Sequence, residues 1–132
     1  MTGERRALQR AVATASIVPL LAGGAGMIGG ADFIASGGGG GGGADLESHM
    51  RYLSGLLFAI GLGFVTAIPR IETHRTRFRL LGALVVTGGL ARLAGLALAD
   101  ALPGPPHLAA LVMELVVTPA LVLWQGRVAE RS

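Results

Sequence analysis

The chain has 132 residues, of which 52% are hydrophobic and only 14% are charged. Soluble domains usually carry about a quarter charged residues, so this composition excludes an ordinary soluble domain and indicates a membrane protein. The absence of cysteine excludes disulfides, thiolate metal sites and cysteine catalysis. The formal charge of +3 does not indicate a nucleic-acid partner, because the arginines cluster at the ends of apolar runs.

Four apolar runs predict four transmembrane helices, at about residues 8–30, 52–68, 80–99 and 108–124. With their interfacial flanks, these runs can cross a hydrocarbon core ~30 Å thick. Pro19 and Pro119 lie inside the first and fourth runs and predict a kink in each. The predicted fold class is therefore all-α, with residues 1–132 forming a single domain, an antiparallel four-helix transmembrane bundle.

The first run has a second interpretation, as a cleaved signal peptide, because arginines precede it and small residues follow it. Its length, its internal proline and the lack of an A-x-A cleavage site favour a retained span. Under the signal-peptide interpretation, three spans would remain and the new N-terminus would lie outside.

The longest connection, residues 31–50, contains the glycine tract Gly37–Gly43. Consecutive glycines have no single preferred conformation, so the tract predicts a flexible loop on the outer side. A phosphate-binding glycine loop would need a flanking strand and helix together with a GK[ST] or GxGxxG pattern. This sequence has none of these features around the tract.

The arginines outside the spans divide unequally between the two sides of the predicted bundle. The side of both termini carries Arg5, Arg6, Arg10, Arg70, Arg75, Arg77, Arg79, Arg127 and Arg131. The opposite side carries only Arg51, among several carboxylates. The positive-inside rule therefore predicts a multi-pass protein of the cell membrane with both termini in the cytoplasm.

Small residues recur at every fourth position in two spans, a pattern that favours close helix packing in lipid. The stripes are Gly55, Ala59, Gly63 and Ala67 in the second span, and Ala83, Thr87, Ala91, Gly95 and Ala99 in the third. We expect these two spans to pack along the stripes. The alternative is that the stripes join a second copy of the chain in a homo-oligomer. Gly26 and Gly30 form a weaker signal in the first span.

Arg92 and Glu114 are the charged residues at membrane depth. Arg92 lies seven residues before Ala99, and Glu114 lies seven residues after His107. At 1.5 Å per residue both lie ~10 Å below the outer boundary, so opposite charges on consecutive antiparallel helices can meet. A lone charge at the bilayer centre costs roughly 2.5–3.5 kcal/mol, and pairing with an opposite charge relieves much of that cost. We therefore predict a buried Arg92–Glu114 ion pair.

Arg51 opens the second span near the outer face, between His49 and the apolar run, and can reach down toward Glu114. We predict a polar site made of Arg51, Arg92 and Glu114, covered by His49 and Glu47. Three interpretations stay open: an ion pair that fixes helix order, a binding site for a ligand, and separate snorkelling of each charge to the interface.

No motif in the sequence predicts catalysis, a cofactor or a metal. His49, His74 and His107 are too scattered for metal ligation, and HExxH, Ser-His-Asp and nucleophile-elbow patterns are absent. We therefore expect no catalytic residue, no cofactor and no metal site. An enzyme hypothesis would rest only on His49 and Glu47 beside the predicted polar site.

The segment from Asp45 to Ala129 resembles the family called domain of unknown function 4345, small four-span bacterial membrane proteins. The resemblance lies in "ESHMRYLSGL", "AIPRIE", "FRLLGALVVTGGLARL" and "LVMELVVTPALVLWQ". The matching positions are His49, Arg51, Pro69, Arg92, Glu114 and Pro119. The heptaglycine departs from the pattern. The resemblance implies a four-span membrane fold and no assigned activity.

Two functions follow as hypotheses. The first is a structural or accessory membrane module whose Arg92–Glu114 pair sets helix packing. The second is a carrier or receptor for a small anionic amphiphile or lipid, bound by Arg51, Arg92 and Glu114 near the outer leaflet. The lipid bilayer is the expected partner in both.

Overall fold

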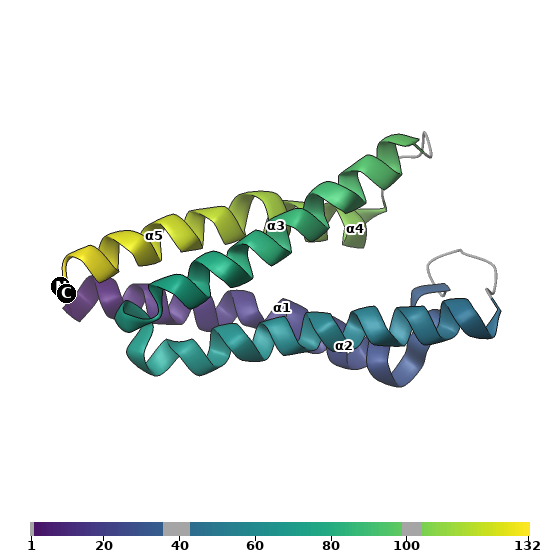
Figure 1. Ribbon diagram of the computed structural model, residues 1–132, viewed down its shortest axis with the longest axis horizontal. Coiled ribbons are helices and arrows are strands. Elements are labelled where there is room, and N and C mark those ends of the chain that lie inside the picture. Colours follow the sequence, from purple (N-terminus) through teal and green to yellow (C-terminus); the bar gives the residue numbers. More distant parts are fainter. Residues whose placement is uncertain (1, 36–42, 99–103) are drawn as a thin grey trace. The chain divides into compact units, whose positions relative to one another are not determined.

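The computed structural model describes residues 2–35, 43–98 and 104–132. These residues are helical almost throughout, and no strand occurs among them. The elements in chain order (Figure 1) are α1 Thr2–Ala35, α2 Ala44–Ala67, the 3-10 helix η1 Ile68–Thr73, α3 Arg75–Leu98, α4 Pro105–Val112, the π-helix η2 Met113–Val117 and α5 Thr118–Glu130.

Four of the helical stretches are long and apolar enough to cross a membrane, and the all-α fold class is confirmed. They are Gly3–Gly30, Ala44–Thr73, Arg75–Leu98 and His107–Glu130. Most extend beyond the predicted runs, because their polar flanks remain helical. Only 6% to 22% of each hydrophobic window is buried inside the molecule, as expected for helices that face lipid.

The predicted loop at residues 31–50 is shorter than expected, because α1 continues to Ala35 and α2 begins at Ala44. Gly43 accepts a hydrogen bond from the Glu47 amide at 3.1 Å and so starts the first turn of α2. The rest of the glycine tract lies outside the described residues, so its predicted flexibility stays a prediction.

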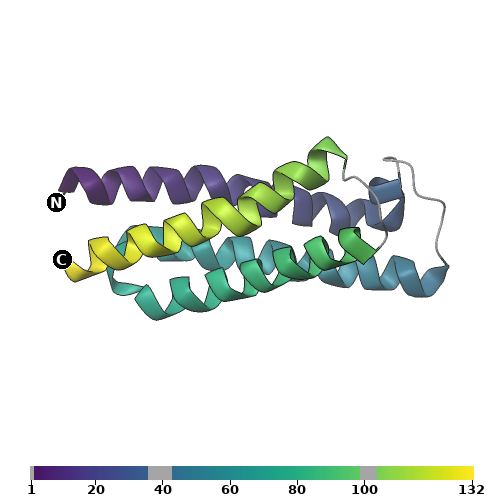
Figure 2. The same ribbon diagram turned by 90° about the horizontal axis from the view of Figure 1, so that it is seen from above.

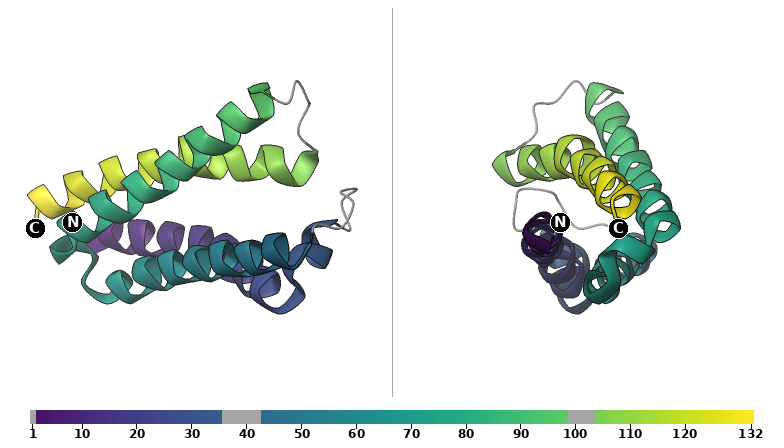
Figure 3. Two further views of the ribbon diagram at one scale, coloured as in Figure 1. Left: turned by 45° about the vertical axis from the view of Figure 1, so that its right-hand side comes forward. Right: turned by 90° about the vertical axis from the view of Figure 1, so that its left-hand side faces the viewer.

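The chain divides into two compact units. Unit 1 comprises Met1–Val12 and Ala67–Ser132, and unit 2 comprises Ala13–Thr66. Within unit 2, α1 and α2 run antiparallel (Figure 3). Within unit 1, α3 runs antiparallel to the α4–η2–α5 stretch (Figure 2).

Glycines of α1 allow α2 to come close in unit 2. A Cβ on Gly23 would lie 2.6 Å from the amide nitrogen of Phe58, and one on Gly26 would overlap the buried side chain of Ser54. Gly26 is one of the two glycines of the first span whose four-residue spacing was only a weak sign of helix packing in the sequence. Close packing without side-chain bulk is the usual way in which membrane helices associate.

In unit 1, α3 packs on η2 and α5 through two buried glycines seven residues apart. A Cβ on Gly82 would lie 2.5 Å from Cγ2 of Val122, and one on Gly89 would lie 2.8 Å from Cβ of Glu114. Residues seven apart share a helix face, so the two glycines form one contact line. Gly89 thereby lets the backbone of α3 approach Glu114.

The small-residue stripe of α3 lies on another face. Its described members, Ala83, Thr87, Ala91 and Gly95, are all exposed, and Ala99 lies outside the described residues. Ala91 follows Gly89 by two residues, about 200° around the helix. Within unit 1, α3 therefore meets α5 and η2 through its Gly82–Gly89 face. The predicted packing of the second and third spans along their stripes would join unit 2 to unit 1 and stays a prediction.

The most completely buried large side chains gather where the elements of unit 1 converge. They are Leu8, Val12, Ile71, Phe78 and Gln125. The Nε2 atom of Gln125 donates to the Ile71 carbonyl at 2.7 Å, and Nε2 of Gln9 donates to the Ile68 carbonyl at 2.8 Å. These bonds tie η1 to α1 and α5, so one end of unit 1 is held by both apolar packing and polar contacts.

Candidate functional site

Glu114 lies in a π-helical turn, η2, which interrupts the fourth span directly before Pro119. A proline ring has no N–H to donate and clashes with the carbonyl four residues earlier, so a wider turn relieves strain at that point. The Met113 carbonyl accepts the backbone N–H of Thr118, five residues later, and also its Oγ1–H at 2.8 Å. The kink predicted at Pro119 thus takes the form of a π turn that carries Glu114.

Arg92 and Glu114 form the predicted ion pair through two parallel hydrogen bonds. The Nε atom of Arg92 lies 3.2 Å from Oε2 of Glu114, and Nη2 lies 3.2 Å from Oε1. This two-bond geometry matches the planar guanidinium to both carboxylate oxygens. The pair joins α3 to the π turn across 22 residues of sequence.

Within unit 1 the pair is partly buried, and its full burial stays a prediction. The Arg92 side chain is 36% exposed and that of Glu114 is 17% exposed. Gly89 lies against Glu114 on the α3 side of the pair.

His107 is a third member of this cluster, and the sequence reasoning did not include it in the site. Its Nδ1 atom lies 3.3 Å from Nη1 of Arg92, and the guanidinium donates this bond when Nδ1 carries no proton. His107 is exposed in the first turn of α4. The sequence spacing could have predicted this contact, because His107 precedes Glu114 by seven residues and so shares its helix face.

Arg51 has its observed partners within unit 2. Its Nε atom donates to Oε1 of Glu47 at 2.7 Å, one helical turn earlier on α2. Its Nη1 atom donates to the carbonyls of Met27 and Ile28 on α1 at 2.6 and 3.1 Å. Arg51 therefore binds the backbone of α1 inside unit 2.

The carbonyls that Arg51 binds lie just before a break in α1 at Gly30. Gly30 has φ 58° and ψ −144°, a left-handed conformation that glycine adopts without a Cβ penalty. A Cβ at Gly30 would overlap the Glu47 carboxylate, so Glu47 packs directly on the break. The interruption of α1 therefore lies at Gly30, whereas Pro19 lies within the helix. Helix ends leave carbonyls without partners, and Arg51 supplies donors for two of them.

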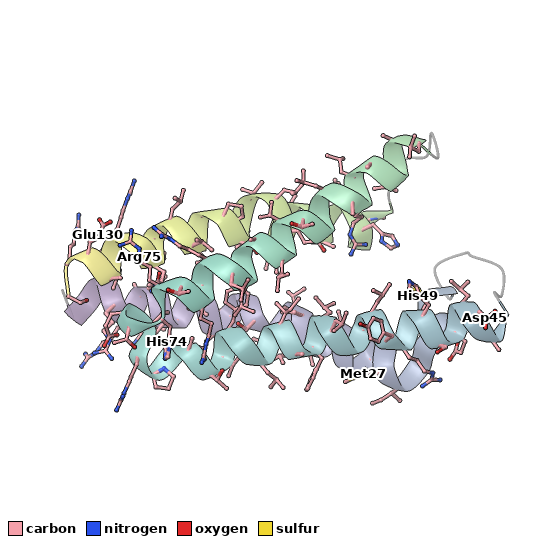
Figure 4. All side chains as sticks on the ribbon, viewed as in Figure 1. Met27, Asp45, His49, His74, Arg75 and Glu130 are labelled. Atoms are coloured by element: carbon pink, nitrogen blue, oxygen red, sulfur yellow. The ribbon has the colours of Figure 1, made fainter. Side chains whose placement is uncertain are left out.

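His49 is the remaining predicted site residue. It lies on α2, two residues before Arg51, and is exposed (Figure 4). Among the described residues, no hydrogen bond or ion pair is found for its side chain.

The predicted five-residue site thus resolves into two clusters. The first consists of Arg92, Glu114 and His107 in unit 1; the second consists of Arg51 and Glu47 in unit 2. A joint Arg51–Glu114–Arg92 network stays a prediction. No group of three or more His, Asp or Glu side chains suited to a metal ion occurs in residues 2–35, 43–98 and 104–132.

Four helices able to cross a membrane, with charged clusters at their ends, suggest a small multi-pass membrane protein. The profile of the family described as "Domain of unknown function (DUF4345)" matches residues 7–125, most of the chain. The chain belongs to this family, and the resemblance seen in the sequence is confirmed. No curated protein and no solved structure matches the chain. The family description gives no activity.

Proposed function

We propose that this protein is a structural or accessory membrane module in which the Arg92–Glu114 pair fixes α3 against the π turn. The observation that carries this proposal is that each nitrogen of the Arg92 guanidinium has a protein partner within unit 1. Two of the nitrogens bond Glu114 and the third bonds His107. These partners offset part of the cost of placing the cation in a membrane without a ligand.

Arg51 supports the same proposal from unit 2. Its guanidinium is engaged by Glu47 and by two backbone carbonyls. Both arginines of the predicted polar site therefore stabilise helix contacts of their own unit.

The proposal is tested by replacing both partners of the pair. The double variant Arg92→Leu/Glu114→Leu should stay folded, because two apolar side chains in lipid need no partner. The single variants Arg92→Leu and Glu114→Leu should each lose about 2–3 kcal/mol of stability, because one charge stays unpaired. Thermal unfolding in detergent, followed by circular dichroism, measures both. A double variant as unstable as the single variants would contradict the proposal.

A second candidate function is a carrier or receptor for a small anionic amphiphile or lipid. It is favoured by the 36% exposure of the Arg92 side chain and by His107 beside it on the exposed side. π turns are frequent at functional sites. Native mass spectrometry of gently solubilised protein separates the two candidates. A small molecule retained by the wild type and lost in Glu114→Gln would support the carrier, whereas no retained molecule in either would support the structural module.

We further propose that both termini lie in the cytoplasm. The Arg131–Glu4 ion pair, at 2.9 Å, joins the beginning of α1 to the end of α5. The arginine-rich segments of unit 1 gather at that end, and the positive-inside rule assigns such an end to the cytoplasm. Because the chain has no cysteine, single cysteines introduced at Ser132 and Asp45 can be labelled by an impermeant reagent on intact cells. Labelling at position 45 alone is the expected result, and labelling at position 132 alone would contradict the orientation.

A further inference from the structure

One end of unit 1, which we call the basic end, is closed by three ion pairs between different elements. It comprises residues 3–12, 67–79 and 124–132. The pairs are Arg5–Glu72, Arg75–Glu130 and Arg131–Glu4, each with a nitrogen–oxygen distance of 2.9 Å. Figure 4 labels Arg75 and Glu130 at this end. The pairs link α1 to η1, α3 to α5 and the end of α5 to α1, and so connect the four elements at this end.

The basic end carries far more positive than negative charge. Its nine arginines face three carboxylates, Glu4, Glu72 and Glu130, and all three carboxylates are used by the ion pairs. Four further arginines, Arg6, Arg70, Arg79 and Arg127, are exposed, and no ion pair joins their side chains to any residue that the structure describes. Their charges are therefore not offset within the described part of the chain.

The four exposed arginines come from four separate elements: α1, η1, α3 and α5. Because the ion pairs hold these elements together, the four arginines belong to one end of unit 1 rather than to one helix. All four lie just outside the predicted apolar runs, within a few residues of one end of a helical span. In a bilayer this is the depth of the lipid headgroups.

We propose that the basic end binds the phosphate groups of anionic membrane lipids through Arg6, Arg70, Arg79 and Arg127. A guanidinium offers two parallel donors to phosphate oxygens, a geometry that favours arginine over a simple point charge. A lipid headgroup is the occupant that fits, because the apolar helices next to the arginines place the acyl chains beside them. The three ion pairs keep the carboxylates away from the bound phosphates. This proposal is independent of the Arg92–Glu114 pair.

The test compares lipid retention by the full chain in detergent micelles, measured by native mass spectrometry with phosphatidylglycerol or phosphatidylcholine. The wild type should retain phosphatidylglycerol well above phosphatidylcholine. The variant Arg6→Gln/Arg79→Gln/Arg127→Gln should lose about 100-fold in phosphatidylglycerol affinity, at roughly fivefold for each arginine removed. Its circular dichroism should match that of the wild type, because the three side chains are exposed.

The matched control neutralises an internal pair. Arg75→Gln/Glu130→Gln leaves the net charge of the basic end unchanged, so its phosphatidylglycerol affinity should stay within about twofold of wild type. Equal retention of the two lipids by the wild type, or an unchanged affinity in the triple variant, would overturn the proposal. Displacement of phosphatidylglycerol by millimolar inorganic phosphate would assign the surface to free anions, and retention of an acidic peptide in preference to lipid would assign it to a protein partner. Each result would overturn the lipid assignment.

Discussion

Arg92 in unit 1 and Arg51 in unit 2 each pair with a glutamate, but the two arginines have different roles in the structure. Arg92 reaches Glu114 on another helix, 22 residues away, whereas Arg51 reaches Glu47 one turn back on its own helix and then binds backbone carbonyls of α1. Arg92 connects two helices through a bond between side chains, whereas Arg51 connects two helices through bonds from its side chain to backbone carbonyls.

This difference decides which cluster can be replaced by apolar residues. The Arg92–Glu114 pair can be removed as a whole, since no polar group remains behind except the exposed His107. Removing Arg51 leaves the carbonyls of Met27 and Ile28 beside a broken helix turn, where lipid offers no donor. An intramembrane ion pair is therefore replaceable, whereas a backbone cap is not.

The largest effect should come from the double variant Glu47→Leu/Arg51→Leu. It should lose about 3 kcal/mol of stability, because two charge-assisted bonds to carbonyls disappear and no apolar side chain can replace them. Thermal unfolding in detergent measures the loss. Arg92→Leu/Glu114→Leu is the matched control. Equal stability of the two double variants would show that the bonds to the α1 carbonyls are as replaceable as the Arg92–Glu114 pair.

Gly30→Ala should cost about 2 kcal/mol. An L-residue is strained at φ 58°, and its Cβ would displace the Glu47 carboxylate from the break in α1. Gly3→Ala serves as the control, because a Cβ there meets nothing within 4 Å. The same unfolding measurement applies, and a Gly30→Ala variant as stable as the control would show that α1 can continue through this position as a regular helix.

Gly89→Ala should cost about 1.5 kcal/mol, because the new Cβ would push Glu114 and Leu115 away from α3. Gly95→Ala, on the exposed face of the same helix, should change the stability by less than about 0.5 kcal/mol or raise it slightly. Comparison of the two melting temperatures tests which face of α3 makes the contact. A larger loss for Gly95→Ala would reassign that face.

The smallest effect should come from His107→Ala. The Arg92–His107 contact is exposed, so its loss should cost about 0.5 kcal/mol in unfolding experiments. His107→Phe controls for the aromatic ring without a nitrogen acceptor. A loss above about 2 kcal/mol would show that His107 is as important to the cluster as Glu114.

The polar pair could be predicted from the sequence because depth follows from counting residues. Arg92 and Glu114 lie at equal distances from the ends of consecutive apolar runs, and helical rise converts these counts into one level. The bonds from Arg51 to the carbonyls of Met27 and Ile28 could not be predicted from the sequence. These carbonyls lie just before the break in α1 at Gly30, and nothing in the hydropathy pattern marks that break.

The sequence by itself determined the four helices able to cross a membrane, the all-α class, the family and the gathering of arginines at one set of helix ends. These properties depend on the local cost of placing apolar or charged side chains in lipid, which each segment carries alone. The tertiary structure decided which glycines make contacts, where α1 breaks and how the turn before Pro119 widens. Lipid is as apolar as the helix surfaces, so contact faces are selected by the fit between side chains of two helices, which neither helix determines alone.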